Sequence, residues 1–439
     1  MAFIPRSWYA FFTKEDNAMH TVETINFIII CLFFACYMYQ FLYIPIAWTA
    51  KKKPSALPVP HRFAVLIAAR NEEAVIGNLI DSIEEQSYPR QLIKIFVAAD
   101  NCTDATAHIA RMHGAQVYER RDLSRRGKGY SLDFLLREIA LHEDEYFDGY
   151  LVLDADNVLD RDFILHMNET FSAGHDIVTC YRNSKNYGDN WISAGYALWF
   201  LRESRYLNGA RMRLGSSCGV SGTGFLFSRA VLEAQGGGWP FHLLTEDIEF
   251  TISNVTRGVK VACCEDAVLY DEQPVSFRQS WAQRLRWSRG YLQVFRVYGR
   301  KLVSGIFRGS FSCYDMAMSI MPAAVLTGLS IAVNVGAAIV NVLYCHEWGV
   351  LGVSALQTLM NLYLTLFAVG AITTVTEWRS IHCPAAKKLL YMFTFPVFML
   401  SYVPIVIQSL FVTPEWTHID HTRTLDVRQI CAGNYRDAV

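Results

Sequence analysis

The sequence predicts a large α/β domain set between apolar helices, and three observations support this. Of its 439 residues, 52% are hydrophobic and 18% are charged, which is more apolar than an ordinary soluble protein. The apolar excess gathers in runs of membrane-spanning length, near the N-terminus and in the last third of the chain. Between them, apolar strand patterns alternate with helical ones, which is typical of a mostly parallel sheet covered on both faces.

Composition excludes several classes of protein. The net charge of −1 gives no general attraction to nucleic acid. The 11 cysteines are too few for a disulfide scaffold and contain no C-x-x-C pair, which argues against a zinc ribbon. Their scatter suits a reducing compartment.

After an N-terminal segment (1–25), residues 26–48 run without a charge, which is long enough to cross a bilayer. A signal peptide is the alternative, but no basic region closely precedes the run and it exceeds the usual apolar core of such peptides. Lys51, Lys52 and Lys53 follow at once. By the positive-inside rule, the next part of the chain is expected in the cytoplasm.

Three later runs are also apolar: 320–344, 351–376 and 389–412. The first two predict transmembrane helices. Pro396 and Pro404 interrupt the third, which therefore predicts an interfacial or re-entrant helix, with a further span as the alternative. On the interfacial reading, the tail 413–439 is cytosolic.

Residues 54–272 predict one soluble domain. Its apolar strands are expected at 63–69, 93–98 and 150–153, and each is followed by a polar cluster. In open α/β sheets, ligands bind beyond the carboxyl ends of the strands, so these clusters predict a binding site. The first strand is not followed by a phosphate-cradling glycine fingerprint.

Asp154 and Asp156 come at the end of the third of these strands. Two close carboxylates repel each other unless a cation lies between them, and Mg²⁺ or Mn²⁺ on a diphosphate would supply it. A solvated turn at the end of a strand is the alternative.

Thr245-Glu246-Asp247 precedes a helical pattern at 248–255. One reading is an N-cap followed by acids that complement the helix dipole. The functional reading makes Asp247 a general base.

Gln283-Arg284-Leu285-Arg286-Trp287 lies in the segment 273–312, which predicts interfacial amphipathic helices. A guanidinium suits a diphosphate and an indole face suits a sugar ring. The alternative is an interfacial helix whose arginines meet anionic lipid. Ser221-Gly222-Thr223-Gly224 is open between a ligand-binding turn and a plain turn.

In their order and gaps, Asp100, Asp154-Ala155-Asp156, Thr245-Glu246-Asp247 and the Gln-x-x-Arg-Trp motif resemble family 2 inverting glycosyltransferases of the membrane-embedded, processive type. Hyaluronan, chitin and cellulose synthases are of this type. The resemblance implies a GT-A (Rossmann-like) fold, a donor of the UDP-glucose or UDP-N-acetylglucosamine class, and Mg²⁺ or Mn²⁺. It implies extension of a β-linked polysaccharide, coupled to translocation, by a multi-pass plasma-membrane protein with a cytoplasmic catalytic domain.

The resemblance also implies roles for individual residues. Asp247 would be the base with Glu246 beside it, and Asp156 would hold the metal. The tail with Trp416, His421 and Arg423 resembles a gating loop, although it matches neither the hyaluronan nor the cellulose synthase pattern residue by residue. The expected nucleotide and substrate contacts are Ala69, Glu72, Asp100, Lys128, Asp154, Gln283, Arg286, Trp287, His421 and Arg423.

Two other functions stay open. A non-processive enzyme would add one sugar to a lipid-linked acceptor, and a membrane scaffold would bind nucleotide without catalysis. The expected partners are a UDP-sugar, a growing polysaccharide or lipid-linked acceptor, and membrane lipids, with no nucleic acid. The sequence predicts neither the sugar nor the oligomeric state.

Overall fold

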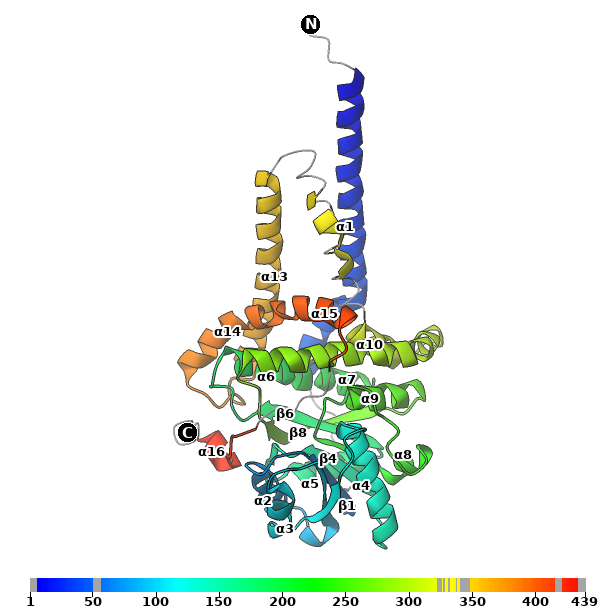
Figure 1. Ribbon diagram of the computed structural model, residues 1–439, viewed down its shortest axis with the longest axis vertical. Coiled ribbons are helices and arrows are strands. Elements are labelled where there is room, and N and C mark those ends of the chain that lie inside the picture. The colour runs from blue at the N-terminus through cyan, green and yellow to red at the C-terminus, as the bar shows by residue number, and fades with distance from the viewer. Residues whose placement is uncertain are drawn as a thin grey trace.

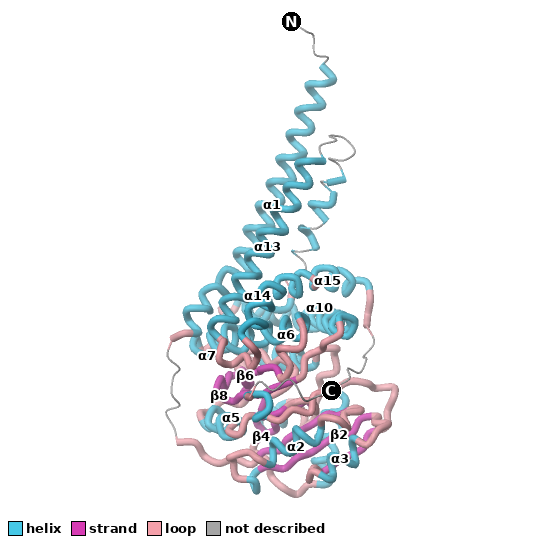
Figure 2. The backbone as a smooth tube through the Cα atoms, turned by 90° about the vertical axis from the view of Figure 1, so that its left-hand side faces the viewer, coloured by secondary structure: helices cyan, strands magenta, loops and turns pink. Residues whose placement is uncertain are grey.

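The computed structural model describes residues 6–49, 57–321, 348–414 and 421–432, together with parts of 326–339. It has an α/β body from which helices extend on one side (Figure 1). The N-terminal helix α1 (Arg6–Ala47) and α13 (Trp348–Thr376) both run away from the body in the same general direction (Figure 2). The start of α1 is therefore far from the sheet.

An eight-stranded mixed sheet forms the centre of the body, in the order β3-β2-β1-β4-β7-β6-β8-β5. β1 pairs in parallel with both β2 and β4, whereas β7 is antiparallel to β4 and β6. The strands are β1 (Phe63–Ala69), β2 (Ile93–Asp100), β3 (Gln116–Arg120), β4 (Gly149–Asp154), β5 (Val158–Leu159), β6 (Ile177–Ser184), β7 (Phe225–Ser228) and β8 (Val261–Asp271).

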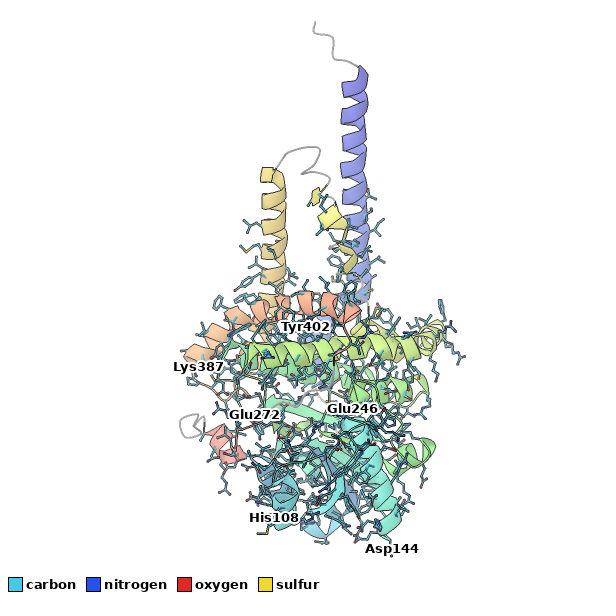
Figure 3. The ribbon with its side chains drawn as sticks, viewed as in Figure 1. His108, Asp144, Glu246, Glu272, Lys387 and Tyr402 are labelled. Atoms are coloured by element: carbon cyan, nitrogen blue, oxygen red, sulfur yellow. The ribbon has the colours of Figure 1, made fainter. Side chains whose placement is uncertain are left out.

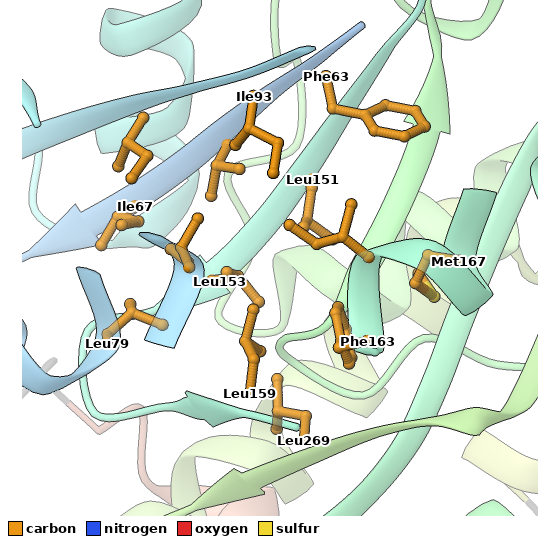
Figure 4. Close-up of a cluster of buried hydrophobic side chains, with 14 of the residues drawn as sticks. Phe63, Ile67, Leu79, Ile93, Leu151, Leu153, Leu159, Phe163, Met167 and Leu269 are labelled. Carbon is orange, nitrogen blue, oxygen red and sulfur yellow. The ribbon is translucent and has the colours of Figure 1, made fainter. Parts of the chain in front are cut away.

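Helices cover both faces of this sheet. One core cluster packs the sheet against α2 and α5, and includes Leu79, Leu153 and Phe163 (Figure 4). The other face carries α4 and a cluster that includes Leu136 and Trp239. The first helices along the chain are α2 (Ile76–Glu84), α3 (Thr106–Met112), α4 (Lys128–His142), α5 (Phe163–Ser172) and α6 (Trp191–Arg202).

After α6 the helix continues as a π-helix, η2 (Glu203–Asn208), into α7 (Gly209–Leu214). The remaining helices are α8 (Arg229–Ala234), α9 (Glu246–Thr256), α10 (Phe277–Phe307), α11 (Phe311–Ile320), α14 (Ala385–Leu400), α15 (Tyr402–Phe411) and α16 (Val427–Cys431), and a 3₁₀ turn, η1, covers Arg90–Leu92. The predicted strands and the helix after Thr245 are confirmed, with shifts of one or two residues at their ends.

A layer of crosswise helices separates the sheet from α1 and α13. α10, α14 and α15 lie roughly perpendicular to those two helices (Figure 1). Arg284 of α10 is fully buried and donates to the Phe398 carbonyl (3.1 Å) and to Ser401 Oγ (2.7 Å). A buried guanidinium with these partners joins the three helices into one unit.

Three helices of the described residues are long and apolar enough to cross a membrane: Thr24–Ala47, Leu359–Thr376 and Ala385–Phe411. They overlap the predicted segments 26–48, 351–376 and 389–412. The segment 320–344 is described only in part, and Lys51, Lys52 and Lys53 lie outside the described residues. Topology and the domain limits stay predictions.

Ala385–Phe411 is divided at Ser401 into α14 and α15. Pro404 stands in the first turn of α15, where a missing N–H costs little. The two helices lie across the axis of α1 (Figure 1), which is the orientation expected of an interfacial segment.

Candidate active site

A cavity of about 710 Å³ lies between the carboxyl ends of the strands and the crosswise helices. Its wall contains every predicted site residue except Arg423: Ala69, Glu72, Asp100, Lys128, Asp154, Asp156, Glu246, Asp247, Gln283, Arg286, Trp287 and His421. Glu246 and Glu272 lie on the sheet side of α10, and Tyr402 lies on the other side (Figure 3). The cavity therefore has a half at the sheet and a half at the crosswise helices, which are called the donor half and the acceptor half after the roles that the resemblance implies.

Strand pairing explains why residues distant in sequence meet in the donor half. β1 lies between β2 and β4, and all three run in parallel. Ala69 pairs with Ala99, and Ala68 pairs with Asp154, so the strands end at nearly the same level. Parallel strands place their carboxyl ends at one edge, where polar side chains can converge.

Asp100 is held rigidly at this edge. It is buried and accepts hydrogen bonds from Arg120 Nη1 (2.7 Å) and Ser131 Oγ (2.8 Å). The ion pair with Arg120 and the hydrogen bond from Ser131 fix the orientation of the Asp100 carboxylate.

Asp154 is paired with Lys128, which begins α4 and also donates to the Gly222 carbonyl (2.8 Å). Gly222 has a φ of +78°, and Gly224 has a φ of +67° with Cys180 Sγ only 2.3 Å from an added Cβ. Only glycine fits both positions. The turn Ser221–Gly224 thus brings backbone into the cavity. This position fits the ligand-binding alternative better than a plain turn.

Asp156 is buried and accepts a hydrogen bond from the Glu272 amide (3.1 Å). Burial alone would raise the pKa of Asp156, but the positive charges of His421 and Lys185 outweigh it, so the pKa is lowered. Lys185 is itself fully buried beside these acids. Asp156 therefore presents an ionised oxygen to the cavity near neutral pH.

The C-terminal tail reaches this point. His421 Nδ1 lies 3.0 Å from both carboxylate oxygens of Glu72, and its Nε2 lies 3.9 Å from Asp156. Burial opposes the charge on His421, but Asp156 and Glu72 raise its pKa to about 10. Burial raises the pKa of Glu72 to about 7. Imidazolium and carboxylates thus hold the tail over the donor half.

Arg423 has a different place from the one predicted. Its Nη2 lies 3.1 Å from Asp189 Oδ2, and its backbone N–H donates to Glu272 (2.9 Å). The Thr422 amide also donates to Glu272 (3.1 Å). In this conformation Arg423 anchors the tail rather than lining the cavity. Trp416 lies outside the described residues.

Glu246 and Asp247 form the first turn of α9. Thr245 is at the N-cap position, but its hydroxyl makes no side-chain capping bond; instead the Gly222 amide donates to Asp247 Oδ2 (2.6 Å). Burial raises the pKa of Asp247, and burial with the charge of Asp247 raises the pKa of Glu246 to about 7. Carboxyls whose pKa values are raised in this way are suited to accepting a proton.

The Gln-x-x-Arg-Trp motif lies on α10, with its two arginines on different faces. Arg286 lines the cavity and donates to the Leu244 carbonyl (2.9 Å), whereas Arg284 is buried against α14. Trp287 meets the Tyr196 ring edge-on at a centroid distance of 5.8 Å. Arg284 therefore does not face anionic lipid, as the interfacial-helix alternative would require.

The cavity residues that could not be predicted from the sequence patterns include Arg182, Glu203, Asp271 and Glu272. Arg182 Nε donates to Asp271 Oδ2 (2.7 Å), and Arg182 Nη1 donates to the Ser221 carbonyl (2.8 Å). Arg182 is near the end of β6, and Asp271 ends β8. Polar residues at the carboxyl ends of β1, β2 and β4 were predicted to form the site. The same argument would have identified Arg182 and Asp271 if β6 and β8 had been recognised as strands.

Residues 60–290 match the family model described as "Glycosyltransferase like family 2", which covers more than half of the chain. The chain belongs to glycosyltransferase family 2. It is 26% identical over 289 residues to a β-monoglucosyldiacylglycerol synthase of Nostoc, covering 62% of this chain and 58% of that protein. It is 23% identical over 242 residues to a poly-β-1,6-N-acetyl-D-glucosamine synthase of Staphylococcus aureus, covering 52% and 54%.

The probable glycosyltransferase YdaM of Bacillus subtilis is 23% identical over 283 residues, covering 58% of this chain and 62% of that protein. The chain thus spans less than two thirds of the length of these curated relatives. A mannosyltransferase of Pyrobaculum calidifontis, solved with GDP-mannose and Mn²⁺, superposes with a TM-score of 0.54 at 19% identity, covering 88% of this chain and 98% of that one. This likeness confirms the predicted GT-A fold.

Proposed function

We propose that this family 2 glycosyltransferase transfers a sugar from a UDP-sugar to extend a β-linked polysaccharide at the membrane, coupled to translocation. The observation that carries the proposal is one cavity that holds Asp156, Asp247 and Trp287 and continues from the sheet edge to the membrane-side helices. Asp156 suits a divalent cation on a nucleotide diphosphate, Asp247 a reacting hydroxyl, and Trp287 a sugar ring. A scaffold that only binds nucleotide would not need a base such as Asp247.

In the proposed mechanism, Asp247 accepts the proton of an acceptor hydroxyl as its oxygen attacks the anomeric carbon of the donor. The bond between that carbon and the diphosphate oxygen breaks, and UDP leaves. One displacement inverts the anomeric centre, so an α-linked donor gives a β-linked product. Arg286 and Lys128, both in the cavity wall, neutralise charge that grows on the diphosphate.

The residues fit a divalent cation held chiefly by its substrate. Asp156 offers a buried, ionised oxygen, but the described residues contain no cluster of three His, Cys, Asp or Glu side chains arranged to hold a metal. Mg²⁺ is typically bound by one or two carboxylates together with substrate phosphates. Bound beside Asp156, Mg²⁺ or Mn²⁺ would stabilise the negative charge of the leaving diphosphate.

A lipid acceptor is the second candidate, and the acceptor half favours it. Leu366 of α13 and Val403 and Val406 of α15 line this half, so part of an acceptor would meet apolar side chains. Some relatives carry the name β-monoglucosyldiacylglycerol synthase. An enzyme of this kind would release a product with one added sugar.

The test uses the full chain purified in detergent with Mg²⁺ or Mn²⁺. UDP release is measured with UDP-glucose, UDP-N-acetylglucosamine and UDP-glucuronate in turn, and the products are sized on a gel. Polymer that lengthens with time supports the polysaccharide proposal, and a single-sugar lipid supports the second candidate. No UDP release from any donor would contradict both.

A further inference from the structure

Glu203 is a carboxylate in the acceptor half to which the mechanism above gives no role. It begins the π-helix η2, directly after α6, and lines the cavity with Tyr291 and Tyr402. π-Helical turns are rare and occur often at functional sites. Its position between α6 and α7 keeps it on a rigid element.

Unlike the acids of the donor half, Glu203 lacks a partner. Among the described residues, none forms a hydrogen bond or a close ion pair with its carboxylate. Burial raises the pKa of Glu203; the charges of Arg211 and Arg182 oppose the rise, and that of Asp247 adds to it. Glu203 is half-buried, so its carboxylate has lost part of its hydration without gaining a donor. A ligand that donates a hydrogen bond would compensate for this loss.

The charges around Glu203 limit what that ligand is. Arg211 is occupied by Asp315 through two contacts, Nε to Oδ2 (2.7 Å) and Nη2 to Oδ1 (2.9 Å). Arg202 Nη2 donates to the neutral Gln40 Oε1 (3.2 Å).

Three arginines act on the charge of Glu203: Arg182, Arg202 and Arg211. Arg182 is paired with Asp271 and Arg211 with Asp315, and the charge of Arg202 is offset by Glu203 itself. None of the three is left to bind a phosphate, which would also face the Glu203 carboxylate.

We infer that Glu203 accepts a hydrogen bond from a hydroxyl group of the acceptor, and that the polar head of this acceptor is uncharged. The inference rests on the proposed glycosyl transfer and deepens it by naming the acceptor chemistry. A terminal sugar of a glycan and the glycerol of a neutral lipid share this chemistry. A polyprenyl phosphate does not.

The first experiment compares Glu203→Leu, which removes both acceptor oxygens, with Glu203→Gln, which keeps one. Because a hydrogen bond to a charged group is lost, Glu203→Leu is expected to raise the KM for acceptor by at least about tenfold. Glu203→Gln is expected to raise it less, and the affinity for UDP is expected to stay at the wild-type value in both. Asp144→Asn, an exposed carboxylate at the far end of the body (Figure 3), is the matched control.

The second experiment uses the wild-type protein and does not depend on how the variants fold. UDP release is measured with dioleoylglycerol, a β-linked oligosaccharide, or undecaprenyl phosphate as acceptor. We expect stimulation by one of the two uncharged acceptors, and which one responds identifies its source. A preference for the phosphate, no stimulation by either uncharged acceptor, or an unchanged KM in Glu203→Leu would overturn the inference.

These results are separable from failure of the proposed function. If the wild-type protein binds no UDP and releases none, glycosyl transfer itself is refuted. If it binds and releases UDP but Glu203→Leu keeps the wild-type KM for acceptor, only the assignment of Glu203 fails.

Discussion

The donor and acceptor halves of the cavity differ in how their carboxylates are satisfied. In the donor half, Asp100 is paired with Arg120 and Asp154 with Lys128. Elsewhere in the cavity, Asp247 accepts a hydrogen bond from the Gly222 amide, and Glu203 has no hydrogen-bond partner among the described residues. Paired acids are fixed in charge and position, whereas poorly paired ones are ready to take a proton or a ligand's hydrogen bond.

This contrast indicates that the two groups of carboxylates have different functions. The donor half would bind the same nucleotide in each turnover, so its charges can be paired within the protein. Asp247 and Glu203 would receive a proton or a hydrogen bond from each new acceptor, so their partners come from the substrate. Four predictions test the comparison, beginning with the largest expected effect.

Asp247→Asn should reduce transfer by about 10²–10⁴-fold, because the amide cannot accept the proton of the hydroxyl. UDP affinity should be unchanged, since the proposed partner of Asp247 is the acceptor hydroxyl and the amide keeps an oxygen that can accept from the Gly222 N–H. Rates are measured by UDP release with acceptor, and affinity by calorimetry. Wild-type transfer by this variant would refute the role of base.

Asp156→Ala should abolish metal-dependent binding of UDP, because it removes the buried oxygen next to the nucleotide site. UDP affinity is titrated with and without Mn²⁺. Asp160→Asn, a nearby carboxylate that is not part of the cavity wall, is the control. Equal Mn²⁺ dependence in Asp156→Ala and wild type would remove Asp156 from the metal site.

Transfer should fall as the pH drops through the raised pKa of Asp247, approaching tenfold per pH unit. Burial raises the pKa of Glu246 to about 7 and that of Asp247 in the same direction. A raised pKa keeps a carboxyl protonated at higher pH, and a base must be deprotonated, so acid inhibits. In the pH profile of kcat/KM, Glu246→Gln should move the inflection to lower pH because it removes a buried like charge.

If kcat/KM does not change between pH 5 and 8, the raised pKa values of Glu246 and Asp247 are contradicted.

Gly290→Ala should destabilise the protein by about 1–3 kcal/mol, the usual cost of overpacking. An added Cβ would lie 2.5 Å from Thr245 Cγ2, which forces α10 away from the start of α9. Thermal unfolding in detergent measures the loss. Gly336→Ala, where nothing lies within 4 Å of the added Cβ, should leave Tm unchanged. Equal Tm values in both variants would disprove the close contact.

Much of the donor half could be predicted from the sequence. The strands at 63–69, 93–100 and 149–154 are revealed by continuous apolar runs, and the residues that follow them necessarily meet at one edge of a parallel sheet. Asp100, Asp154 and Asp156 were found in this way. Arg182 and Asp271 were missed because their strands, β6 and β8, were not recognised.

The sequence by itself therefore determined the α/β domain, the apolar helices and the order of the motifs, since these depend on local periodicity and residue type. Only the tertiary structure decided which polar groups have partners. His421 reaches Glu72 across 349 residues of chain, Arg423 turns to Asp189, and Glu203 is left in the cavity. Such pairing depends on long-range packing, which a local pattern of residues does not encode.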